Sequence, residues 1–81
     1  ISLIMTKYKW TKKDNENVTR GYIDNKNHII IQQENPHIPV NSIKMKCQNC
    51  LYLHKGAVKG ALKNYSKVHY IVWNAIMNER Q

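Results

Sequence analysis

The stretch that decides the predicted fold is Val18-Thr19-Arg20-Gly21-Tyr22-Ile23-Asp24-Asn25-Lys26-Asn27-His28-Ile29-Ile30-Ile31-Gln32. Two runs rich in apolar residues, 18–23 and 28–32, flank the polar residues 24–27. Asn and Asp tolerate the left-handed backbone conformation of tight turns, so this pattern predicts a β-hairpin. Gly21 would weaken the first strand or mark a bulge in it.

Two further segments alternate in the manner of strands on either side of this hairpin in the sequence. Residues 7–10 would place Tyr8 and Trp10 on one face of a strand. Residues 42–47 would place Ile43, Met45 and Cys47 on one face, and Lys44 and Lys46 on the other. The polar residues 12–17 and the proline-containing residues 34–39 are expected to form connecting loops.

The hydrophobic period changes to a helical one in the C-terminal part of the chain. At about 100° per residue, nine apolar side chains fall on one broad arc: Val58, Ala61, Leu62, Tyr65, Val68, Ile71, Val72, Ala75 and Ile76. From Leu51 or Lys55 to Met77 the pattern predicts one long helix, or two helices with Ser66 capping the second. The expected fold class is therefore α+β: a small antiparallel sheet of three or four strands with these helices packed on one face.

The length of 81 residues predicts a single domain over residues 1–81, rich in strands up to residue 50 and helical from 51 to 81. Because residue 1 is Ile, either Met5 is the natural start or the chain is a fragment of a longer protein. No apolar run approaches the ~20 residues that a membrane-spanning helix needs. We therefore expect no membrane span.

The charge is the strongest functional clue, since 13 Lys and Arg residues stand against 5 Asp and Glu residues for a net charge of +8. Four lysines recur every fourth residue on one flank of the predicted helix: Lys55, Lys59, Lys63 and Lys67. No acidic residue lies three or four positions away to neutralise them, whereas a phosphate backbone would. Tyr70 on the same flank would stack on an unpaired base. The strand lysines Lys7, Lys9, Lys44 and Lys46 would widen this surface.

The expected partner is therefore nucleic acid, with RNA favoured over duplex DNA. This preference rests on the lack of a recognition-helix motif and on the position of Tyr70 among lysines. Two alternatives stay open: a basic face that only interacts with solvent, and a face that docks on an acidic protein partner or inhibitor.

Cys47, Cys50 and His54 follow the spacing C-x2-C-x3-H, which makes them a weak zinc candidate. A fourth ligand would have to come from His28, His37 or His69, because no second pair with zinc-finger spacing follows. Two buried structural thiols, or a redox pair or disulfide, are the alternatives. No cofactor is expected. The compartment stays open, with a reducing cytoplasm favoured.

The few acidic residues argue against metal-dependent nuclease chemistry, which needs converging carboxylates. Cleavage of RNA through its own 2′-hydroxyl needs only an acid, a base and cations around the phosphate. The residues available for this chemistry are His28, His37, His69 and Arg20. The sequence thus favours a metal-independent endoribonuclease of the toxin or effector type, with a non-catalytic nucleic-acid-binding module as the alternative.

Overall fold

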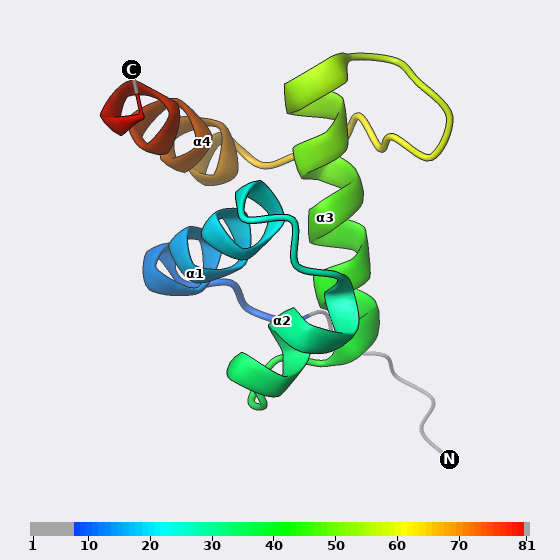
Figure 1. The fold of residues 1–81 in the computed structure, drawn as a ribbon, viewed down its shortest axis with the longest axis vertical. Helices are drawn as coiled ribbons and strands as arrows, with labels where there is room; N and C mark the ends of the chain where they lie inside the picture. The colour runs from blue at the N-terminus through cyan, green and yellow to red at the C-terminus, as the bar shows by residue number, and fades with distance from the viewer. Residues whose placement is uncertain (1–7, 81) are drawn as a thin grey trace.

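The fold is seen in a computed structural model that describes residues 8–80, and every regular element in them is an α-helix (Figure 1). α1 spans Lys12–Ile23, α2 His28–Glu34, α3 Val40–Lys55 and α4 Lys67–Glu79. The expected α+β fold is wrong, because the described part of the chain contains no strand. The domain is instead a small globule of packed helices.

The segment that was expected to form a hairpin supplies the end of α1 and the whole of α2. Its turn chemistry is used, since Asn25 adopts a left-handed conformation with φ 64°. Asn27 then caps α2, because its side-chain oxygen accepts a hydrogen bond of 3.0 Å from the backbone N–H of Ile30. A short apolar run does not distinguish strand from helix, and here the polar turn joins two helices.

The polar residues 12–17, expected to form a loop, are the first turns of α1. Thr11 caps this helix: its Oγ1 accepts a 3.0 Å hydrogen bond from the backbone N–H of Asp14. The Asp14 carboxylate accepts in return from the backbone N–H of Thr11 at 3.3 Å. This reciprocal capping box starts the helix despite the polar composition of its first turns.

The two remaining strand predictions are also wrong. Residues 8–10 are irregular, and Lys7 lies outside the described residues. Residues 42–47 belong to α3, so their exposure follows a helical period: Met45 is 52% exposed, whereas Lys46 is only 6% exposed. A strand would have given these two neighbours the opposite exposures, because its alternation places every second side chain in the core.

The helical prediction from Leu51 or Lys55 to Met77 is only partly right, because within it only residues 51–55 and 67–77 are helical. The first of these pieces is the end of a helix that begins at Val40 and includes the segment expected to form a strand. α3 ends at Lys55, and Gly56 follows it with a left-handed φ of 79°. Residues 56–66 form no helix. Ser66 caps α4 as predicted, since its Oγ accepts a 3.1 Å hydrogen bond from the backbone N–H of His69.

The core forms where α1 packs on the other three helices. Its central cluster is Val18, Ile31, Ile38 and Ile43, and α4 adds Val72, Trp73 and Ile76. Gly21 lets α1 and α2 approach closely, because a Cβ there would lie 2.8 Å from Cγ1 of Ile31. Figure 1 shows α1 and α4 on one side of α3 and the connection 56–66 on the other. None of the helices described is both long and apolar enough to cross a membrane.

Candidate nucleic-acid interface

The first half of α3 presents an open polar face to solvent. It consists of Asn41, Lys44, Met45 and Gln48, which we call the α3 face. Asn41, Lys44 and Met45 are exposed and Gln48 is partly exposed. The spacing i, i+3, i+4, i+7 places these side chains together on one side of the helix. The opposite side of α3 carries the buried residues Ile43 and Cys50, so the helix is anchored by its inner face.

A tight connection of residues 35–39 fixes α3 relative to α2. Asn35 follows the last residue of α2, and its side chain donates a 2.9 Å hydrogen bond to the carbonyl of Ile31. The backbone N–H of Ile38 bonds to the carbonyl of Asn35 at 3.0 Å, and the Ile38 side chain is fully buried. These contacts set the position of α3 relative to α2. The loop predicted here from Pro36 and Pro39 is confirmed.

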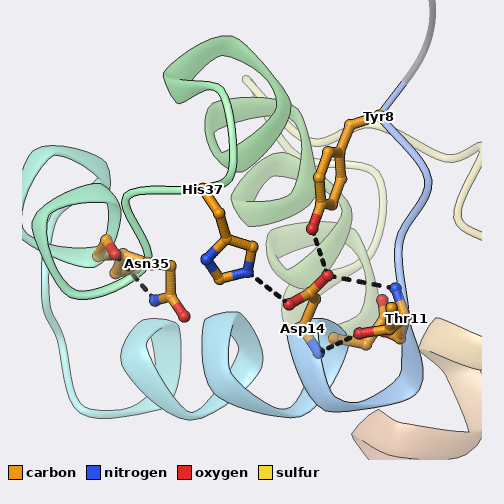
Figure 2. Close-up of polar contacts among 7 residues, drawn as sticks. Tyr8, Thr11, Asp14, Asn35 and His37 are labelled. Carbon is orange, nitrogen blue, oxygen red and sulfur yellow. Dashed lines mark hydrogen bonds and ion pairs between the residues drawn. The ribbon is translucent and has the colours of Figure 1, made fainter.

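A buried carboxylate ties three segments together next to this turn. Figure 2 shows Tyr8, Thr11 and His37 converging on Asp14, which is only 5% exposed. The Tyr8 hydroxyl donates to Oδ2 of Asp14, and Nε2 of His37 lies 2.9 Å from Oδ1. The pKa of Asp14 is raised by burial, but hydrogen bonds from His37, Tyr8 and Thr11 outweigh this and lower it to about 2. The group is therefore a structural anion.

The N-terminal segment also touches α3 directly. Nζ of Lys46 lies 4.5 Å from the centre of the Trp10 ring, in a cation–π contact. Burial lowers the pKa of Lys46. Lys46 was predicted to be exposed and to contact nucleic acid. Its predicted exposure is wrong, because the side chain is buried and its ammonium group lies against the Trp10 ring.

Ion pairs within residues 8–80 gather at the ends of α1, α2 and α4. Arg20 pairs with Glu79 at 3.1 Å, Lys26 with Glu34 at 2.9 Å, and Arg80 approaches Asp24 at 4.0 Å. By contrast, residues 35–78 contain no Asp or Glu at all. The lysines of residues 35–78 thus have no acidic residue near them in the sequence.

The four lysines expected on one helical flank lie instead at and between the ends of two helices. Lys55 ends α3, Lys67 begins α4, and the other two lie on the connection; all four are exposed. We call residues 55–67 the lysine loop. None of its lysines makes an ion pair with another residue in the range 8–80. The cluster of lysines predicted from the sequence is therefore exposed, but it lies on a loop and not on one helical flank.

The lysine loop is held against α3 rather than free of it. The backbone N–H of Leu62 donates to the carbonyl of Gln48 at 3.1 Å, and the Asn49 side chain donates to the Leu62 carbonyl at 2.8 Å. Tyr65 lies between Tyr52 and Tyr70, with ring centres 6.0 and 5.8 Å apart. These contacts hold the part of the lysine loop around Leu62 and Tyr65 against α3.

The candidate zinc ligands are not gathered into a metal site. No three His, Cys, Asp or Glu residues within residues 8–80 are placed to hold a metal ion. Cys47 and Cys50 are free thiols, and burial raises their pKa values to about 11 and about 12. Nδ1 of His54 lies 3.4 Å from the Tyr22 hydroxyl. Burial therefore favours the protonated form of both thiols at neutral pH.

The four residues proposed for catalysis are dispersed. His37 contacts Asp14 and Arg20 pairs with Glu79. His69 is fully buried, and its Nε2 lies 3.2 Å from Sγ of Cys50. His28 is partly exposed at the start of α2. No hydrogen bond or ion pair in the described chain joins any two of these four residues. The imidazole of His69 is enclosed and cannot reach a phosphate. The nuclease and toxin expectation thus has no support in this geometry.

Comparisons with protein-family models, with curated proteins and with solved structures gave no match for this chain. Function is therefore inferred from geometry alone. Sequence reasoning missed Asn41, Met45 and Gln48, because it placed Met45 on the inner face of a strand over residues 42–47 and left the other two outside that strand. The capping box Thr11-x-x-Asp14 was a local signal for α1, whereas α3 follows Pro39 with no side-chain cap that could have indicated it.

Proposed function

We propose that the chain is a non-catalytic DNA-binding domain that inserts α3 into the major groove of duplex DNA. The observation that carries this proposal is the α3 face on the second of two helices joined by a rigid five-residue turn (residues 35–39) and braced by α1. Helix-turn-helix domains use this order of elements and read bases with the N-terminal half of the second helix. The α3 face lies on that half.

The residue types on the α3 face suit the edges of bases. Asn41 and Gln48 carry amides, which pair bidentately with adenine, and Lys44 can donate to guanine O6 and N7. Met45 offers an apolar contact for the methyl group of thymine. From Asn41 to Gln48 the face spans about two turns of helix, roughly 10 Å along the axis, which corresponds to about three base-pair steps.

Phosphate contacts would come from the lysines that lack acidic partners. The lysine loop lies beside α3, and Lys9, Lys12 and Lys13 are exposed at the start of α1. Each lysine that neutralises a phosphate releases a counterion, so the affinity would fall steeply with salt. The lysines would thus position the protein on the DNA backbone, whereas the α3 face would contact the bases.

Duplex DNA replaces the earlier preference for RNA for a geometric reason. The major groove of B-form DNA, about 12 Å wide, admits a helix, whereas the major groove of A-form RNA is deep and narrow. The RNA preference rested on the lack of a recognition-helix motif, for which α3 is now a candidate, and on Tyr70, whose ring stacks on Tyr65 with centres 5.8 Å apart.

The proposal is tested by selection from a random-sequence DNA pool, followed by binding measurements on the enriched site. We expect Asn41→Ala, Lys44→Ala and Gln48→Ala each to weaken binding to that site about tenfold. Asn74→Ala, at an exposed position of α4, is the matched control and should leave binding unchanged.

Double-stranded RNA, single-stranded RNA and an acidic polypeptide serve as competitors in the same assay. Failure to enrich any DNA sequence, with the α3 variants binding as well as the unmodified protein, would overturn the proposal. Stronger competition by RNA than by unrelated DNA would indicate that the protein binds RNA instead of DNA. Binding to the acidic polypeptide alone would indicate a protein partner.

A further inference from the structure

A cavity of about 400 Å³ opens between the C-terminal halves of α1, α3 and α4, away from the α3 face. Its wall residues come from all three helices: Tyr22 of α1, His54 and Lys55 of α3, and Trp73 and Met77 of α4. Trp73 is buried, Tyr22 and Met77 are partly exposed, and His54 and Lys55 are exposed. The cavity therefore has an apolar floor and a polar opening.

Three aromatic rings surround this space. The centre of the Trp73 ring lies 6.1 Å from that of Tyr22 and 6.0 Å from that of His54. Tyr22 and His54 are 6.1 Å apart and meet edge to face. No two of these rings stack face to face; Tyr22 and His54 keep exposed surface at the opening, whereas the buried Trp73 forms the base. The thioether of Met77 adds a soft, adaptable contact.

The charged residues that line the cavity are two lysines, one of which is neutralised by a carboxylate outside the lining. Lys26 and Lys55 both line the cavity, and no carboxylate does. Lys26 is already paired, because its Nζ lies 2.9 Å from Glu34. Lys55 makes no ion pair with any residue of 8–80 and is the cation left for a ligand. A cationic guest would be repelled here, whereas an anionic one would be attracted.

We propose that this cavity binds a small planar aromatic molecule with a single negative charge, with its ring against Trp73 and Tyr22 and its anion near Lys55. The volume lies within the range of about 300–1,000 Å³ usual for ligand sites, and apolar walls with few polar groups are typical of them. This inference goes beyond DNA binding and does not require it, because none of the α3 face lines the cavity and Lys55 alone is shared with the lysine loop.

The experiment is a titration of the isotope-labelled protein followed by amide NMR signals. Three indoles of similar size serve as probes: indole-3-acetate, which is anionic, 3-methylindole, which is neutral, and tryptamine, which is cationic. We expect saturable shifts at Tyr22, His54, Trp73 and Met77, with affinity in the order anion, neutral, cation. Acetate should not reproduce these shifts.

Two lysine variants separate this site from general attraction to a basic surface. Lys55→Gln, an exposed substitution that leaves the core intact, should weaken indole-3-acetate binding about three- to fivefold and leave 3-methylindole binding unchanged. Lys12→Gln, at the far end of α1, should change neither. Absence of saturable shifts, equal binding of tryptamine, or an affinity unchanged by Lys55→Gln would each overturn the proposal.

Discussion

Two buried polar clusters hold this small core, and they do so in opposite ways. Asp14 keeps a charge in the interior because three neighbours, Tyr8, Thr11 and His37, hydrogen-bond its two carboxylate oxygens. His69 is equally buried but neutral, with its pKa lowered to about 3 by burial and then by the positive charge of Lys46. Its Nε2 contacts Cys50, and its Nδ1 has no partner among the described residues. A buried ion is retained where it joins several segments, whereas a buried neutral ring is tolerated for its shape.

The largest effect should come from removing the charged member of the first cluster. We expect Asp14→Ala to lower the free energy of unfolding by about 3 kcal/mol, because several charge-assisted hydrogen bonds are lost and the buried groups lose their partner. Urea denaturation at neutral pH measures this change.

Thr11→Ala is the control for Asp14→Ala, since it removes the cap of α1 but leaves Tyr8 and His37 on the carboxylate. Its cost should be about 1 kcal/mol. Equal losses in the two variants would show that Asp14 contributes through capping alone and would contradict the role of the cluster in tying three segments.

The two clusters should also weaken the fold in different pH windows. His69 has an unfolded pKa near 6.5 and a folded value of about 3, so the unfolded chain binds more protons between these values. Stability should therefore fall as the pH drops from 6.5 toward 3. Asp14 adds a second loss between its unfolded pKa of 3.8 and its folded value of about 2. Urea denaturation at a series of pH values measures both windows. A stability that is constant from pH 6.5 to 4 would contradict the first.

How far the sequence predicts this fold depends on how local each signal is. Ser66 as a cap and the loop at Pro36 and Pro39 were predictable, because capping and proline act within a few residues. The runs 18–23 and 42–47 were assigned the wrong period, since six residues fit a strand or a helix almost equally well. Packing of these segments against the other helices determined that both are helical.

The candidate sites divide along the same line. The excess of lysines and the lack of acidic residues around Lys55 to Lys67 can be read from the sequence, so the positive charge of this region was predictable. The pairing of His37 with Asp14 spans 23 residues and exists only once α1 has packed on the turn before α3. The α3 face likewise required knowing that residues 40–55 form one helix.

A smaller effect is expected from trimming one donor of the first cluster. Tyr8→Phe keeps the ring, including its edge-to-face contact with Trp10 at 5.3 Å, and removes only the hydroxyl that bonds to Asp14. We expect a loss of about 1 kcal/mol in the free energy of unfolding. Because Asp14 raises the pKa of the Tyr8 hydroxyl and burial raises that of Tyr22, absorbance titration of the phenols should show two late tyrosines, of which the variant keeps one. No change in either measurement would remove Tyr8 from the cluster.

The smallest effect should come from the second cluster, and it is the sharpest test of the difference between the two. His69→Met replaces the buried ring with a flexible apolar side chain of similar volume and removes the nitrogen that lacks a partner. The weak contact with the Cys50 thiol is lost at the same time, so the two changes offset each other. We expect the free energy of unfolding at pH 7 to change by less than about 1 kcal/mol. Since Met does not titrate, the variant should also keep its stability between pH 6.5 and 4, where the unmodified protein loses it. A loss as large as that of Asp14→Ala would mean that His69 is a required polar partner, and the contrast between a charged anchor and a neutral filler would fail.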